Sequence, residues 1–137
     1  RADAALRRAG KYADGWLGIW CSSDRYAESI VMYDQAAAEA DRDIQADHGI
    51  QLWVGVGKDR AEAASFVGPA MEGFYRVPFA KFSRYTPHGT VDDIVDFLAP
   101  YLEAGCRHFN LTPVASTPEA GIEVIGEVGE RLRRMTD

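Results

Sequence analysis

A short polar loop with the sequence CSSDR, residues 21–25, follows a continuous apolar run. Two serine hydroxyls, the backbone N–H groups at the start of a predicted helix and the Arg25 guanidinium are groups that can hold a phosphate. Most helix starts are only capped, and here Ser23 or Asp24 would be the cap. The residues favour capping but leave both interpretations open. Under the anion-binding interpretation, the candidate residues are Ser22, Ser23 and Arg25.

Two further polar side chains, Asn110 and Thr112, lie in or at the end of an apolar run that predicts a buried strand at residues 107–111 and a loop at residues 112–116. Each needs a hydrogen-bond partner if it is buried. Satisfaction within the packed fold is the favoured interpretation, and lining a cofactor pocket is the alternative. The loop would lie at the carboxyl end of its strand, where parallel α/β proteins bind ligands.

The sequence carries no motif that names a catalytic residue. It contains neither GxSxG nor HExxH, and no paired carboxylates that predict acid–base catalysis. His48, His88 and His108 are scattered, and a lone histidine in a strand, such as His108, is more often a satisfied core residue than a base. Cys21 and Cys106 form neither a CxxC nor a zinc-ligand pattern. We therefore expect two reduced, half-buried thiols, no metal site and a reducing cytoplasm.

Three tryptophans, Trp16, Trp20 and Trp53, could flank a planar ring, although packing in the core is the better default. The loop GVGKD at residues 55–59 lacks the pattern of a phosphate-binding GxGxxG. Lys58 is therefore expected to be a solvated charge.

The elements that must position these residues alternate between helix and strand. Apolar periodicity predicts five helices, at residues 1–12, 25–46, 58–75 with an interruption at 68–69, 91–104 and 118–135. Continuous apolar runs predict three strands, at residues 16–21, 50–56 and 107–111, the first of them buried on both faces. Residues 78–88 have no clean period, and long irregular segments are often binding loops.

Several residues predict where helices begin and end. Thr90 and Asp93 resemble a capping box, and Thr117 with Pro118 suits the N-cap and first helical positions. Gly105 can supply the left-handed conformation that ends a helix.

Strands separated by helices imply right-handed crossovers and a parallel sheet. A complete (β/α)8 barrel needs about 250 residues, whereas this chain has 137. We therefore predict an α/β fold that is the C-terminal half of a TIM barrel, with residues 1–137 as a single domain within a larger barrel. The chain starts without Met and already in a helical pattern, as a piece that begins inside an element would.

The composition is that of an ordinary globular domain, with 47% hydrophobic and 26% charged residues. A net charge of −6 disfavours nucleic acid and anionic membranes as partners. No apolar stretch approaches the 20 or so residues of a transmembrane helix.

Three strings in this order, ALRRAGKYADGW at residues 5–16, PFAKFSRYTPHGT at residues 78–90 and EAGCRHFNLTPVA at residues 103–115, resemble the bacterial luciferase-like monooxygenase family. The resemblance implies a TIM barrel that binds FMN or reduced F420 at the carboxyl ends of its strands. The cofactor would perform hydride transfer or oxygen activation on a small organic substrate.

The resemblance also implies which residues lie near the cofactor and what the chain binds. It makes Ser22, Ser23, Arg25, Lys81 and Arg84 candidates, in addition to the polar residues at the end of the last predicted strand. It implies a homo-oligomer and either a missing N-terminal half of the barrel or a second chain. A half-barrel should expose apolar strand edges and helix faces.

Two alternatives to an F420- or FMN-dependent oxidoreductase stay open. One is a non-catalytic half-barrel that binds flavin or only a partner chain. The other is an unrelated α/β domain.

Overall fold

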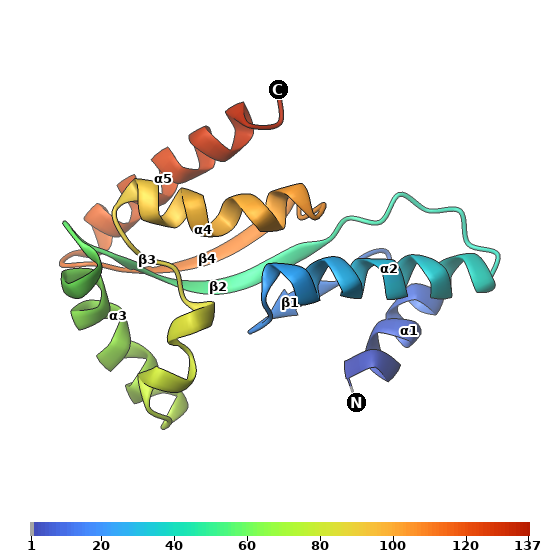
Figure 1. Cartoon of the computed structure of the whole chain (residues 1–137), viewed down its shortest axis with the longest axis horizontal. Coiled ribbons are helices and arrows are strands. Elements are labelled where there is room, and N and C mark those ends of the chain that lie inside the picture. The colour runs from blue at the N-terminus through green and yellow to red at the C-terminus, as the bar shows by residue number, and fades with distance from the viewer. Residues whose placement is uncertain (1) are drawn as a thin grey trace. The chain divides into compact units, whose positions relative to one another are not determined.

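A computed structural model describes residues 2–137 of the chain (Figure 1). The helices are α1 (Ala2–Tyr12), α2 (Ser23–Glu39), α3 (Arg60–Tyr75), α4 (Val91–Glu103) and α5 (Pro118–Arg134). The strands are β1 (Leu17–Ile19), β2 (Gly49–Val56), β3 (His88–Gly89) and β4 (His108–Val114), and two 3-10 turns, η1 (Phe79–Lys81) and η2 (Ser83–Tyr85), precede β3. The predicted first helix is confirmed from its second residue, since Arg1 lies outside the described residues.

The chain divides into two compact units. Unit 1 contains the chain up to Gln51 together with Tyr101–Asn110, and unit 2 contains Leu52–Pro100 and Leu111–Asp137. The elements β2, α4 and β4 each contribute residues to both units.

The strands form an open α/β sheet, and the parallel pairing of β2 with β1 and β3 is as predicted. In unit 1, β1 pairs with the beginning of β2, with Leu17 opposite Gly49. In unit 2, the end of β2 pairs with β3, with Gly55 opposite His88. The strand β4 also pairs with β2. The prediction of three strands was wrong, because the described part of the chain contains a fourth strand, β3. This strand has only two residues and therefore shows no periodicity in the sequence.

The core of unit 1 is built on α2, which packs against α1. Tyr26 and Tyr33 are fully buried, as their stripe predicted. The backbones approach closely here, since a Cβ on Gly10 would lie 2.4 Å from the Tyr33 carbonyl oxygen. The prediction that this helix reaches residue 46 was wrong. The guanidinium of Arg42 instead donates to the carbonyls of Gly10 (2.7 Å) and Ala13 (2.9 Å), which draws the chain away from the helical path.

His48 is buried immediately before β2. Its Nδ1 accepts a hydrogen bond from the Trp16 backbone N–H (3.2 Å), and its ring packs edge-on against Tyr33. Burial lowers the pKa of His48.

The core of unit 2 is a cluster of Val67, Met71 and Phe82, with Trp53 and Tyr75 packed against it. The predicted interruption of α3 at residues 68–69 was wrong, because the helix continues through its internal Pro69. Packing explains the continuity: Val67 and Met71 on either side of the proline are fully buried. In Figure 1, α3 extends to one side of the strands of unit 2, and α4 and α5 lie on the other side.

Three predictions of burial were wrong. In β1, Leu17 and Ile19 are 52% and 46% exposed, so the strand is buried on one face only. The last strand, β4, extends to Val114 and is not buried, since its residues alternate between exposed and half-buried. On α5, apolar spacing predicts that Ile122, Val128 and Leu132 face inward; Val128 and Leu132 are buried, but Ile122 is 66% exposed.

The cap signals predicted at Thr90, Gly105 and Thr117 are confirmed. Thr90 and Asp93 form the capping box, and Thr117 caps α5 ahead of Pro118. Gly105 follows α4 with a φ of +101°. Within the part of the chain that the structure describes, no helix has the length and apolar character needed to cross a membrane.

Candidate functional site

The start of α2, directly after β1, carries the polar loop that the sequence singled out. The cap is Ser22 rather than Ser23 or Asp24, because the Ser22 Oγ accepts a hydrogen bond from the Arg25 backbone N–H (3.2 Å). Ser22 adopts an extended backbone, which is the usual conformation of an N-cap. Ser23 is the first residue of the helix.

Arg25 connects α2 to α1. Its guanidinium forms an ion pair with Asp3 and a longer one with Glu28 (3.5 Å). The hydrogen bond and charge of Arg25 lower the pKa of Asp3, and the same contacts raise the pKa of Arg25. The arginine charge is therefore balanced by two carboxylates, and any anion at this helix start would depend mainly on backbone N–H groups and the helix dipole.

A cavity of about 320 Å³ lies in unit 1 beside this loop. Trp16, Trp20, Leu17 and Ile19 supply its apolar wall, and Arg25 lies among the lining residues. Trp20 has a φ of +48°, an uncommon conformation for a bulky residue that turns the chain sharply at the end of β1. If these tryptophans flank a planar ring, this cavity is where Trp16 and Trp20 would do so. Trp53 lies in unit 2, where its Nε1 donates to the Tyr75 hydroxyl (2.9 Å).

The two cysteines are free thiols in unit 1, as expected, with Cys21 half-buried and Cys106 buried. Burial raises the pKa of both. The fully buried Tyr26, whose hydroxyl lies against Cys106, also has a raised pKa. All three groups are therefore held neutral, which makes them packing groups rather than nucleophiles.

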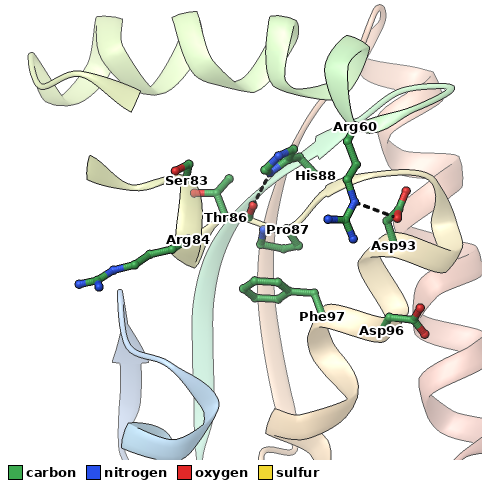
Figure 2. Close-up of a pocket in the computed structure, with 9 residues that line it drawn as sticks. All are labelled: Arg60, Ser83, Arg84, Thr86, Pro87, His88, Asp93, Asp96 and Phe97. Carbon is green, nitrogen blue, oxygen red and sulfur yellow. Dashed lines mark hydrogen bonds and ion pairs between the residues drawn. The ribbon is translucent and has the colours of Figure 1, made fainter. Parts of the chain in front are cut away.

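A second cavity, of about 370 Å³, lies in unit 2 (Figure 2). It is lined by nine residues from α3, η2, the segment around β3, and α4: Arg60, Ser83, Arg84, Thr86, Pro87, His88, Asp93, Asp96 and Phe97. The helices α3 and α4 begin directly after β2 and β3, so Arg60 and Asp93 lie near the carboxyl ends of two parallel strands. That position is where parallel α/β folds place ligands.

The charges in this second cavity are paired. Arg60 Nε lies 3.1 Å from Asp93 Oδ1, while Asp93 Oδ2 accepts from the Thr90 backbone N–H (2.9 Å). The hydrogen bond from the Thr90 N–H is the largest cause of a lowered pKa of Asp93, and the hydrogen bond from Arg60 adds to it. Arg84 stacks over the Tyr85 ring at 4.5 Å, and Figure 2 shows its side chain extending away from the Arg60–Asp93 pair.

The remaining predicted site residues are exposed. Lys81 is on η1, Asn110 is in the unit 1 part of β4, and Thr112 is in the unit 2 part. Asn110 and Thr112 are both exposed, so the condition of burial under which each would need a hydrogen-bond partner is not met. The favoured interpretation of His108 as a core residue was also wrong: its side chain is 64% exposed, and Nε2 lies 2.7 Å from Asp47 Oδ2.

Sequence reasoning missed the role of Arg60, Asp93 and His88 as residues that line one cavity. The rule of examining the residues after each strand would have reached Arg60 if it had been applied one residue beyond the Asp59 cap. His88 carries no such signal, because its two-residue strand is invisible to periodicity. Among residues 2–137, no three side chains of His, Cys, Asp or Glu gather in a way that could hold a metal ion.

The fold and the two cavities define the class of protein as a parallel α/β fold with ligand-sized cavities that helix starts help to line. Residues 1–108 match the luciferase-like monooxygenase family, and the chain belongs to this family. Family membership excludes the alternative of an unrelated α/β domain. Among curated proteins, none matches the chain.

Several solved structures share this fold. An F420-dependent secondary alcohol dehydrogenase in complex with an F420–acetone adduct is 18% identical, with a TM-score of 0.77 over 92% of this chain and 45% of its own. The coenzyme F420-dependent tetrahydromethanopterin reductase from Methanopyrus kandleri is 16% identical, with a TM-score of 0.70 over 91% and 47%. Monooxygenase RslO1 from Streptomyces bottropensis is 14% identical, with a TM-score of 0.72 over 98% and 46%.

This chain therefore spans less than half the length of each of these three structures. They are TIM-barrel enzymes, and the described residues correspond to part of such a barrel.

Proposed function

We propose that this chain is part of an oxidoreductase or monooxygenase that uses F420 or FMN and acts on a small organic substrate. The observation that carries the proposal is the family match over residues 1–108. Similar folds in F420-dependent enzymes and in a monooxygenase support it. When bound, such a cofactor supplies hydride transfer or oxygen activation.

The donor groups at the start of α2 fit the phosphate end of such a cofactor. A helix start carries several N–H groups without intrahelical partners, and the Ser22 hydroxyl satisfies only that of Arg25. Ser22 and Ser23 would add hydroxyl contacts, while Arg25 would orient the loop through its ion pairs. In unit 2, the proposed contacts are the exposed side chains of Lys81, Arg84 and Thr112, and in unit 1 the exposed side chain of Asn110 is a further one.

We also propose how the chain is completed, how it assembles and in which compartment it lies. Residues 1–137 would form part of a larger barrel domain, completed by further residues or by a second chain, in a homo-oligomer. The free thiols of Cys21 and Cys106 fit a reducing cytoplasm.

The test is a comparison of ligands that share a ring and differ in the phosphate. The protein containing this chain, at its native length, is titrated with FMN, riboflavin and F420, and binding is followed by flavin or deazaflavin fluorescence. We expect FMN or F420 to bind, and riboflavin to bind about tenfold or more weakly than FMN where FMN binds, because it lacks the charge-assisted contacts of the phosphate.

The variant Ser22→Asp locates the phosphate. Aspartate keeps the helix cap but places a carboxylate where the phosphate would lie, so the affinity for FMN or F420 should fall while that for riboflavin stays unchanged. Thr117→Asp makes the same exchange at the cap of α5 and should leave both affinities unchanged. If neither F420 nor FMN binds, the enzyme proposal fails, and a half-barrel that binds a partner chain becomes the better account.

A further inference from the structure

The imidazole of His88 is held in one orientation at the wall of the unit 2 cavity. Its Nδ1 lies 2.7 Å from the carbonyl oxygen of Thr86, the contact drawn as a dashed line in Figure 2. Thr86 is itself fixed, because it is 2% exposed and its hydroxyl donates to the carbonyl of Phe82 (3.0 Å). The edge of the Phe79 ring packs against the imidazole. The ring is therefore held between the buried Thr86 and the half-buried Phe79.

This geometry determines which nitrogen carries the proton. A carbonyl oxygen only accepts hydrogen bonds, so Nδ1 of His88 must be the donor. In the neutral imidazole, Nε2 then bears a lone pair and acts as an acceptor. Within the described residues, Nε2 of His88 makes no hydrogen bond. His88 therefore contributes an oriented nitrogen acceptor to the lining of the cavity.

The charged groups around His88 favour a neutral ligand. Arg60 from α3 and Arg84 from η2 are opposed by Asp93 and Asp96 from α4, so the lining residues carry no net charge. Arg60 is already paired with Asp93. No excess charge of either sign is left to attract an ion.

Of the lining residues, only Phe97 and Pro87 are apolar, and the others are polar or charged. Phe97 and the fully buried Pro87 lie on the cavity wall, and Figure 2 shows the Phe97 ring directed toward Pro87. The volume of about 370 Å³ is in the range of sites for small organic molecules. Binding sites of this kind combine an apolar contact with a small number of placed polar groups.

We propose that the unit 2 cavity binds a small neutral alcohol, whose hydroxyl donates a hydrogen bond to Nε2 of His88 and whose hydrocarbon part packs on Phe97. The inference concerns unit 2 alone and holds whether or not the chain binds a redox cofactor.

The test uses cyclohexanol and cyclohexanone, two probes of matched size of which only the alcohol can donate. Binding to the full chain is measured by NMR titration, with the protonation of His88 followed on its Cε1–H resonance. With the imidazole neutral, cyclohexanol should bind about fivefold or more tightly than cyclohexanone, the factor expected for one hydrogen bond. When His88 is protonated, Nε2 becomes a donor, and the preference should shift to the ketone.

The variant His88→Phe keeps an aromatic ring and removes the acceptor, so the preference for the alcohol should disappear. His108→Phe is the matched control, because His108 is exposed in unit 1 and does not line this cavity. If His88→Phe fails to fold, judged by its NMR spectrum, the pH-dependent shift in the wild-type chain decides. Equal binding of both probes at all pH values, unchanged alcohol binding by a folded His88→Phe, or no binding of cyclohexanol up to its solubility limit would overturn the proposal.

Discussion

At the scale of single residues, Ser22 is the group on which the capping and anion-binding interpretations of the CSSDR loop differ. Its hydroxyl accepts from the Arg25 N–H, so capping accounts for its conformation in the protein alone. The ion pairs of Arg25 with Asp3 and Glu28 show that the arginine also has a structural role. An anion would therefore add to an existing cap and would not create it.

Replacing Ser22 by alanine should lower the free energy of unfolding by about 1 kcal/mol, because the Arg25 N–H loses its partner. Urea unfolding followed by circular dichroism measures the change. Ser22→Asp should restore the lost stability, since aspartate is an equally good cap. An alanine variant as stable as the wild type would show that the hydroxyl does not cap α2.

Asp93 should give the stability of unit 2 a dependence on pH. Hydrogen bonds from Thr90 and Arg60 lower its pKa from the ordinary value of 3.8. Because the folded-state pKa is depressed, the stabilisation is fully present above pH 3.8 and is lost as the pH falls through the folded value. Urea unfolding across that range should show the wild type losing its advantage over Asp93→Asn on acidification. A constant difference at all pH values would contradict this assignment.

At the scale of elements, the turn between β3 and α4 depends on Gly89. This residue has a φ of +140°, and a Cβ there would lie 2.3 Å from Oδ2 of Asp93, in the middle of the capping box. Gly73, inside α3, has open space around the position of a Cβ. Substitution by alanine should therefore change the stability of the protein in opposite directions at these two glycines.

Gly89→Ala should lower the free energy of unfolding by about 2 kcal/mol or more, through backbone strain and the clash with Asp93. Gly73→Ala should raise it by about 0.5–1 kcal/mol, because alanine is the better helix former. Paired chemical denaturation curves measure both changes. Two substitutions with the same sign would show that the turn tolerates a side chain, against the geometry described here.

Local signals predicted these elements well where neighbouring residues determine the structure. The caps at Thr90 and Thr117 rest on hydrogen bonds between residues three apart, which the sequence displays directly. The end of α2 at Glu39 could not be predicted in this way, because it depends on Arg42 reaching carbonyls about 30 residues earlier in the chain. The continuity of α3 through Pro69 likewise depends on the burial of neighbouring side chains.

The candidate site was predictable only in part for the same reason. The loop after β1 has a local signature of hydroxyls and a helix start. The unit 2 cavity does not, since Arg60, His88 and Asp93 are brought together by the pairing of β3 with the end of β2. A two-residue strand gives no periodicity from which that pairing could be inferred.

At the scale of the whole molecule, the account rests on the chain being part of a luciferase-like barrel. In unit 1, the apolar side chains of Leu17 and Ile19 on β1 are about half exposed, as expected of a strand that further barrel residues would cover. The three similar structures are each more than twice the length that this chain matches. Completion of the barrel would place further residues around the cofactor.

The measurement that tests the central claim most directly is native mass spectrometry of the protein containing this chain, after incubation with F420 and, separately, with FMN. We expect a polypeptide mass near twice 15.1 kDa and a bound species heavier by the mass of one cofactor per polypeptide. An absorbance spectrum of the same sample should show the corresponding deazaflavin or flavin band. A protein that carries neither cofactor after both incubations would contradict the account.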